Sequence, residues 1–190
     1  YKGSRWYPKE NRRMRITGGV LRGRKIDCPA GIIRPAMDKM KESVFSILGD
    51  IEEYSFLDLF SGSGSIALEA SSRGANPVVL VEKDTIKFNT IKKNIQIAPK
   101  PIAYKCISAE LFLKRNKTQF DIVFCDPPFP YKFHKELIAL CSDFSVIHEN
   151  GLVILHRPSE VFIPDTIQNL KRKDQRTFGR SVVDFFSYKA

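Results

Sequence analysis

The sequence predicts an α/β fold in which an open, mostly parallel β-sheet carries helices on both faces and ends in an antiparallel hairpin. Between residues 54 and 157, five short apolar runs alternate with segments of helical period. This alternation is typical of a parallel sheet that is covered on both sides. After residue 167, two period-2 segments flank Thr177-Phe-Gly179 with no helix between them, which favours a closing antiparallel pair.

The individual elements can be placed along the chain. Residues 14–27 predict a short hairpin or extended arm with Gly18-Gly19 at its turn. A helix is expected to follow, with Asp38 as its N-cap and Gly49 at its end. Its expected apolar face consists of Met40, Val44, Ile47 and Leu48. Strands are expected over 54–60, 77–84, 102–107, 120–125 and 151–157, and helices over 61–74, 85–97, 109–116 and 133–144.

Length and composition indicate one globular unit. A chain of 190 residues with 43% hydrophobic residues can bury a core without disulfides, and it holds no apolar run long enough to span a membrane. We interpret residues 1–13 as a tag or disordered leader, 14–50 as a basic hairpin and helix, and 51–190 as the main domain. The four widely spaced cysteines predict neither a metal site nor a disulfide framework and indicate a reducing, cytoplasmic location.

The positive charge is concentrated at the N-terminus. Residues 1–41 contain twelve Lys/Arg and three Asp/Glu, a net charge of +9 out of +10 for the whole chain. Such a segment is either a solvated basic face or an arm for a polyanion such as nucleic acid. The candidate RNA-binding residues are Arg15, Arg22, Arg24, Lys25 and Arg34.

A glycine-rich loop follows the first expected strand of the main domain. Gly62 and Gly64 precede Ala67 in a G-x-G-x-x-A pattern, and Glu82 lies twenty residues after Gly62. This spacing is typical of a loop that binds an adenosine cofactor, with the acid on the ribose hydroxyls, although a ligand-free turn is the alternative. Asp58 favours S-adenosylmethionine over NAD, because a carboxylate would repel a pyrophosphate and attract a sulfonium and an ammonium.

These segments resemble a known family. Asp58, Gly62, Gly64, Glu82 and Asp126-Pro-Pro-Phe129 are similar to the motifs of Rossmann-like S-adenosylmethionine-dependent methyltransferases. With "MRITGGVLRGRKI" and "RPAMDKMKESVFSIL", the chain from about Met14 to Tyr188 resembles the bacterial 16S rRNA guanine-N2-methyltransferases. The resemblance implies a seven-stranded sheet, and a substrate that is 16S rRNA or a small-subunit assembly intermediate.

The sequence departs from the family pattern after the third expected strand. Where such enzymes often carry an acid beside a small residue at the adenine, this chain has Ser108-Ala109. A serine can still exchange a hydrogen bond with an adenine amine, but it is neutral and has a shorter reach. We expect both Ser108 and Ala109 to contact the cofactor.

The DPPF motif follows the fourth expected strand. It is either a simple turn or the catalytic centre, and its position beside a cofactor loop favours the second. Asp126 and the carbonyl of Pro127 can accept both N–H groups of an exocyclic amine, and Phe129 offers a face for the base. Tyr131 is a further candidate for the aromatic wall beside that base, and the reaction needs no metal. We interpret His134 and His156 as surface or packing residues.

Other functions remain open on the sequence alone. The same motif serves methylation of adenine in DNA and of glutamine in proteins, and a non-catalytic RNA-binding factor could share the fold. The sequence does not specify the nucleotide, the need for an assembled particle, or the oligomeric state, for which a monomer is the working expectation. We expect no membrane partner.

Overall fold

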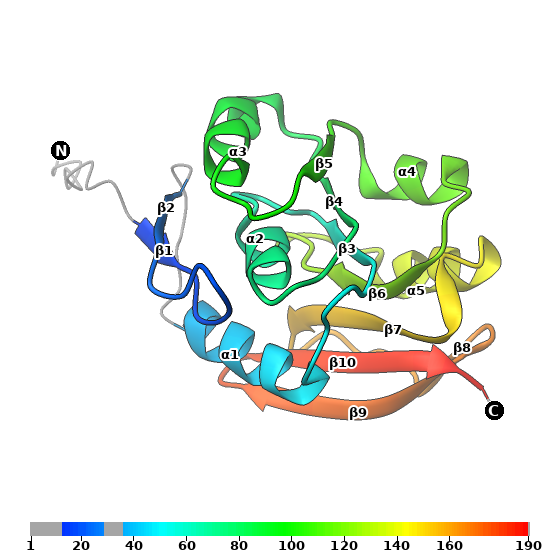
Figure 1. Cartoon of the computed structure of the whole chain (residues 1–190). Coiled ribbons are helices and arrows are strands. Elements are labelled where there is room, and N and C mark those ends of the chain that lie inside the picture. Colours follow the sequence, from blue (N-terminus) through cyan, green and yellow to red (C-terminus); the bar gives the residue numbers. More distant parts are fainter. Residues whose placement is uncertain (1–12, 29–35, 190) are drawn as a thin grey trace, which may run out of the picture.

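The structure, a computed structural model, describes residues 13–28 and 36–189, which are organised around one large mixed sheet (Figure 1). The strand order is β5-β4-β3-β6-β7-β10-β9-β8. The strands are β3 (Phe56–Leu59), β4 (Val78–Val81), β5 (Ile102–Lys105), β6 (Phe120–Cys125), β7 (Ile147–Pro158), β8 (Thr166–Ile167), β9 (Leu170–Phe178) and β10 (Ser181–Tyr188). Strands β3 to β7 are parallel, and β10, β9 and β8 each pair antiparallel with the strand before them in this order.

The α/β class, the parallel sheet and the C-terminal antiparallel hairpin β9–β10 are confirmed, but the prediction of seven strands is wrong. The sheet has eight strands, because Thr166 and Ile167 form β8 by pairing with Lys171 and Leu170 at the edge. A strand of two residues is too short to leave a period-2 pattern in the sequence. This explains why the sequence predicts β9 and β10 but not β8.

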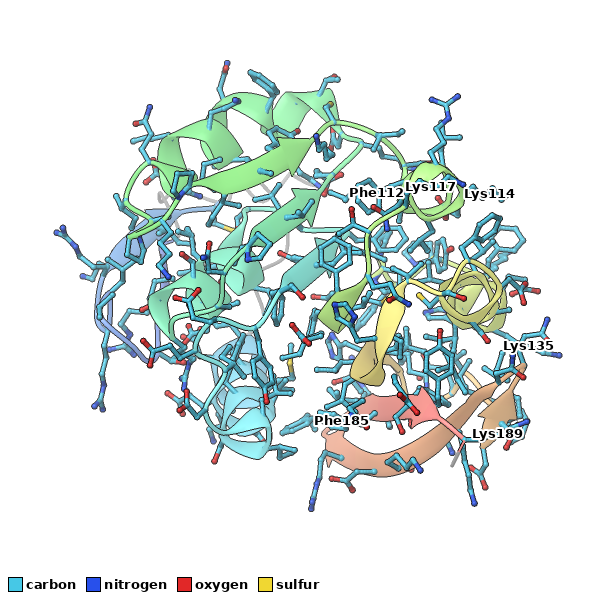
Figure 2. All side chains as sticks on the ribbon, turned by 45° about the vertical axis from the view of Figure 1, so that its right-hand side comes forward. Phe112, Lys114, Lys117, Lys135, Phe185 and Lys189 are labelled. Carbon is cyan, nitrogen blue, oxygen red and sulfur yellow. The ribbon has the colours of Figure 1, made fainter. Side chains whose placement is uncertain are left out.

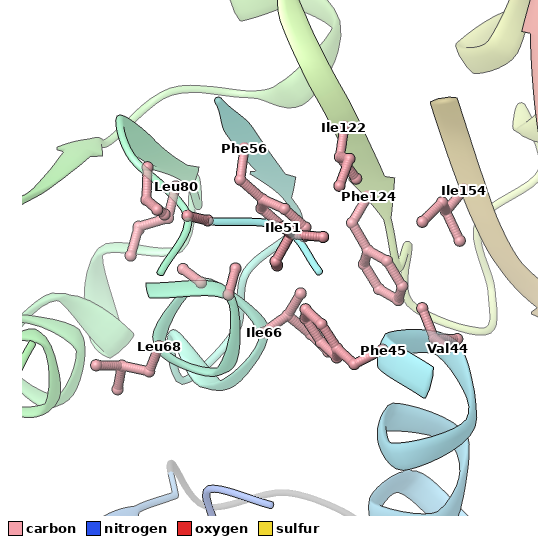
Figure 3. Close-up of a cluster of buried hydrophobic side chains, with 14 of the residues drawn as sticks. Val44, Phe45, Ile51, Phe56, Ile66, Leu68, Leu80, Ile122, Phe124 and Ile154 are labelled. Carbon is pink, nitrogen blue, oxygen red and sulfur yellow. The ribbon is translucent and has the colours of Figure 1, made fainter. Parts of the chain in front are cut away.

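Helices cover both faces of the sheet, as expected from its apolar strands. They are α1 (Ala36–Leu48), α2 (Ser65–Ser72), α3 (Phe88–Ile95), α4 (Ala109–Arg115) and α5 (His134–Asp143), and a 3₁₀ turn, η1 (Thr85–Lys87), precedes α3. One buried cluster joins α1, α2 and α3 to one face of the sheet, and a second joins α4 and α5 to the other. Figure 3 shows the first cluster, in which Phe45 of α1 stacks on Phe56 of β3 at a centroid distance of 6.1 Å.

The first helix differs from its prediction in two respects. It begins at Ala36, so Asp38 lies in its first turn and is not the N-cap. Its buried face uses Met40, Val44 and Phe45, whereas Ile47 is 40% exposed. Phe45 belongs to the buried face because its ring stacks on the ring of Phe56 on β3. Gly49 ends the helix as expected, with a positive φ of 69°.

The basic N-terminal segment forms a separate two-stranded sheet, β1 (Arg13–Arg15) with β2 (Lys25–Asp27). The hairpin is confirmed, but its turn lies after Gly18-Gly19, where Arg22 N–H donates to the carbonyl of Gly19. The glycines instead allow close packing on α2. A Cβ on Gly19 would lie 1.9 Å from the carbonyl oxygen of Ser72. The predicted leader, residues 1–13, lies outside the described residues except for Arg13, which begins β1.

Candidate active site

The register of the parallel strands brings three ionisable side chains to one edge and one face of the sheet. Asp58 of β3 pairs with Phe124 of β6, and Phe124 pairs with Ile154 of β7. Asp126, directly after β6, and His156, in β7, each lie two residues beyond the pair Phe124–Ile154. Their side chains therefore lie beside each other on the face that also carries Asp58. This edge is formed by the carboxyl ends of parallel strands, where open α/β sheets bind ligands.

The glycine loop connects β3 to α2 at this edge. Gly62 and Gly64 have φ values of 61° and 81°, in the left-handed region that favours glycine. The backbone N–H of Gly62 donates to Oε2 of Glu82 at 2.9 Å, so the loop and the expected ribose acid are in contact. A Cβ on Gly62 would meet nothing within 4 Å, which leaves open space beside the loop backbone.

Glu82 already has several partners. Its Oε2 also accepts from Nζ of Lys87 at 3.1 Å, and its Oε1 accepts from the backbone N–H of Asp84 at 2.9 Å. Because a carboxylate offers about four acceptor positions, Glu82 retains room for a further hydrogen bond. The ion pair with Lys87 was not expected from the sequence; the spacing of five residues across a strand–helix turn gives no helical signal for it.

Asp58 lies beneath the loop with 1% of its surface exposed. Its Oδ2 accepts hydrogen bonds from the hydroxyl of Ser61 and the backbone N–H of Ala67, while its buried Oδ1 has no partner among the described residues. Burial, with a smaller contribution from the charges of Asp126 and Glu82, outweighs these two hydrogen bonds and raises the pKa of Asp58 to about 7. Through these two hydrogen bonds, Asp58 connects β3 to the glycine loop and to the first turn of α2.

A cavity of about 860 Å³ lies between the glycine-loop edge and the DPPF segment. Its acidic lining comes from Glu82, Asp84 and Asp126, and its aromatic lining from Phe60, Phe129 and Tyr131. Phe60 and Tyr131 meet edge-on at 5.2 Å, and the hydroxyl of Tyr131 donates to Glu110 at 2.8 Å, which fixes this wall. The remaining lining residues are Lys83, Thr85, Lys87, Pro127, Pro128 and His156.

The DPPF segment holds its catalytic candidates at the cavity. Asp126 is partly exposed, Pro127 is buried, and Phe129 is 39% exposed at the rim. The backbone N–H of Tyr131 donates to the carbonyl of Pro128 at 2.8 Å, which closes a turn after the two prolines. The structure therefore brings Asp126, Pro127 and Phe129 together with Glu82 around one cavity.

His156 is a site residue that the sequence reading missed. Its Nδ1 lies 2.8 Å from Oδ1 of Asp126, and the residue is 8% exposed. The sequence places it at the end of an apolar run, but its contact depends on β7 being the neighbour of β6. The signal in the sequence is that Asp126 directly follows the apolar run 120–125 and His156 directly follows the apolar run 151–155. His134, by contrast, is buried and packs edge-on against Tyr131.

Of the expected cofactor contacts, Glu82 lines this cavity and Gly62 is joined to it by its hydrogen bond to Glu82, whereas Asp58, Gly62 and Gly64 are not lining residues themselves. Ser108 and Ala109 lie apart from the cavity. Ser108 is the N-cap of α4, and its hydroxyl oxygen accepts from the backbone N–H of Leu111 at 3.2 Å. Ala109 is buried at the start of the same helix. Neither residue lines the cavity, although both follow β5, next to β4 in the sheet. Their contact with a cofactor stays a prediction.

The candidate RNA-binding residues of the hairpin are exposed. Arg15, Arg22, Arg24 and Lys25 all face solvent, and Arg34 lies outside the described residues. The hairpin lies beside the glycine loop, because Asn94 of α3 donates to the carbonyls of both Asp27 and Ser63. Neither a helix long and apolar enough for a membrane nor a metal-holding group of three His, Cys, Asp or Glu occurs within residues 13–28 and 36–189.

Comparison with known proteins identifies the family. The family described as "Conserved hypothetical protein 95" matches residues 14–187. The chain belongs to this family. The matched residues include both the basic hairpin and the DPPF segment, so both belong to the pattern of this family.

Relatives and solved structures agree with this assignment. The chain is 31% identical over 181 residues to "Putative rRNA methyltransferase YlbH" of Bacillus subtilis, covering 91% of this chain and 98% of the relative. It is 32% identical over 181 residues to "Ribosomal RNA small subunit methyltransferase D" of Haemophilus influenzae, covering 87% and 91%. The solved structure of "Putative methyltransferase yhhF" from Escherichia coli superposes with a TM-score of 0.85 at 29% identity, covering 94% and 99%.

Proposed function

We propose that this protein transfers a methyl group from S-adenosylmethionine to the exocyclic N2 amine of a guanine in 16S rRNA, in the cytoplasm. The observation that carries the proposal is the cavity shared by Asp126, Phe129 and Glu82 in a chain of this family. Relatives named as methyltransferases of small-subunit rRNA support the reaction and the RNA. The choice of guanine N2 rests on the sequence resemblance of the N-terminal segments.

The residues around the glycine loop fit S-adenosylmethionine. Gly62 leaves open space beside its backbone, and Glu82 retains an acceptor position for a ribose hydroxyl. Asp58 keeps an unpartnered buried oxygen below the loop, and Asp84 and Asp126 add negative charge around the cavity. This acidic set suits a ligand with a sulfonium and an ammonium group. When bound, the cofactor supplies an electrophilic methyl group.

Asp126 and Pro127 position the nucleophile. An exocyclic amine is weakly nucleophilic because its lone pair is delocalised into the ring. Oδ2 of Asp126 and the carbonyl of Pro127 can accept its two N–H groups and so direct the lone pair towards the methyl donor. The prolines bring no N–H donor of their own into the cavity.

The aromatic wall and the hairpin hold the RNA. Phe129 at the rim can stack on an extruded base, an interaction worth about 1–3 kcal/mol. Phe60 and Tyr131, fixed edge-on, form the wall behind it. Exposed cations of the hairpin, next to the glycine loop, can neutralise phosphates that flank the base.

Methyl incorporation from labelled S-adenosylmethionine tests the proposal. We expect incorporation into 16S rRNA or an immature small subunit, and mass mapping should place the added mass on N2 of one guanine. DNA and a protein acceptor serve as parallel acceptors in the same assay. Methylation of DNA adenine or of glutamine in preference to rRNA would contradict the proposal, and a protein that fails to bind S-adenosylmethionine by calorimetry would be a non-catalytic factor.

Asp126→Ala tests the assigned chemistry. The substitution removes the acceptor that orients the amine, so we expect kcat to fall by about 100-fold or more, with a much smaller loss of cofactor affinity from the removed charge. Asp143→Asn, an exposed carboxyl at the end of α5, is the matched control and should retain activity. Full activity in Asp126→Ala would contradict the mechanism.

A further inference from the structure

The contact between Asp126 and His156 has a consequence for catalysis. The side chain of His156 is 10% exposed and that of Asp126 22% exposed, so the imidazole lies behind the carboxylate. Both line the same cavity. The hydrogen bond occupies Oδ1 of Asp126. Within the described residues Oδ2 accepts no hydrogen bond, and it is not one of the buried polar atoms that lack a partner.

We propose that His156 is a positioning residue that locks the Asp126 carboxylate so that Oδ2 faces the substrate amine; this inference rests on the proposed function. A free carboxylate on the first residue after a strand can rotate about its side-chain bonds. The bond from His156 removes this freedom at one oxygen and leaves the other for the amine. A group held in its reactive orientation before the substrate arrives saves that ordering cost in the transition state.

The surroundings of the imidazole define which nitrogen carries the proton. A carboxylate only accepts hydrogen bonds, so Nδ1 of His156 must be the donor. Nε2 is buried and has no hydrogen-bond partner among the described residues. The hydrogen bond to Asp126 therefore assigns a proton of His156 to Nδ1.

The backbone supports this role. His156 belongs to β7, which is paired on one side with β6 and on the other with β10, where Val183 is its partner. His156 directly follows the last β6–β7 pair, Cys125–Leu155, and is itself paired with β10, so its backbone has little freedom to move. Asp126 follows β6 directly, and its backbone N–H donates to the carbonyl of Leu59 at 3.3 Å. The imidazole is thus a rigid support for a carboxylate at the start of a loop.

A pair of substitutions separates positioning from packing. His156→Leu keeps the volume and removes the donor, whereas the side-chain amide of His156→Asn places a donor at the position of Nδ1. We expect His156→Leu to lower kcat about 10- to 100-fold, with the KM for RNA and the Kd for S-adenosylmethionine within about threefold of wild type. His156→Asn should recover most of this loss. His148→Leu, the same change at an exposed site on β7, is the control.

A second measurement does not depend on methyl transfer. Nitrogen NMR of the imidazole in the ligand-free protein should show the proton of His156 on Nδ1 in wild type and a changed environment in Asp126→Asn. A proton on Nε2, an unchanged kcat in His156→Leu, or equal losses in the Leu and Asn variants would overturn the positioning role. A wild type that methylates no acceptor would contradict the proposed function alone, and the NMR result would then decide on His156.

Discussion

Asp58 is a carboxyl group at a position where ionisation is costly. It lies beneath the glycine loop, and burial raises its pKa to about 7. Two hydrogen bonds to Oδ2 support the charged form but do not offset the loss of water around Oδ1. The carboxyl group that hydrogen-bonds to the glycine loop and to α2 therefore titrates near neutral pH.

The pH dependence of stability should reveal this group. Because the folded pKa of Asp58 is above its unfolded value of about 4, its favourable contribution is complete below pH 4 and is lost as pH rises to 7. Asp58→Asn removes the titration. In urea unfolding, the stability of wild type relative to Asp58→Asn should fall between about pH 4 and pH 7. Glu149→Gln, at an exposed site, should show a constant difference, and a constant difference for Asp58→Asn would refute the raised pKa.

At the scale of elements, α2 is the piece that joins the glycine loop to the basic hairpin. Glu69 of α2 is fully buried, and its carboxylate accepts from the backbone N–H and the hydroxyl of Thr17, both at 2.8 Å. Lys41 of α1 is also fully buried. Its Nζ lies 3.7 Å from Glu69 and donates to Ser65, the first residue of α2, and to the carbonyl of Arg15.

This buried pair should be strongly coupled. Glu69 also pairs with Arg73 at 3.0 Å and Lys41 with Asp38 at 3.5 Å. Removing Lys41 or Glu69 alone leaves the other buried with one charged partner fewer, a loss of up to about 3–5 kcal/mol, whereas removing both is less costly. We expect Glu69→Leu and Lys41→Met each to be strongly destabilising in urea unfolding, and the double variant to be more stable than the sum of the two losses predicts. The exposed pair Lys100–Glu53 is the control; Lys100→Ala should change stability by less than about 1 kcal/mol. Additive losses at Lys41 and Glu69 would show that the pair does not interact.

The sequence predicts those elements whose residues repeat a pattern over at least four positions. The parallel strands, their helices and the β9–β10 hairpin belong to this group. The two-residue strand β8 does not, because its pairing depends on the adjacent strand and not on its own composition. The site shows the same division: the loop and DPPF motifs are local, but the contact of His156 with Asp126 and the burial of Lys41 depend on which elements become neighbours.

At the scale of the whole molecule, two sets of three exposed cations lie on opposite sides. Arg22, Arg24 and Lys25 lie on the hairpin beside the glycine loop. A second set, Lys114, Lys117 and Lys135, projects from the α4–α5 side, away from the hairpin (Figure 2). Both sets carry a charge of +3, but only the hairpin is attached to the element that carries the glycine loop. The two sets are therefore a matched pair for testing where RNA binds.

Triple alanine variants of the two sets should behave differently. If the hairpin contacts phosphates near the target base, Arg22→Ala/Arg24→Ala/Lys25→Ala should raise the KM for rRNA about 10-fold or more at moderate salt. The slope of log K against log [salt] should also become shallower by about 2, since each phosphate contact to a single strand contributes about 0.7 to that slope. The Kd for S-adenosylmethionine should not change. Lys114→Ala/Lys117→Ala/Lys135→Ala, with the same change in net charge, should leave the KM within about threefold of wild type; equal effects from both variants would mean that net charge alone, and not the hairpin, attracts the RNA.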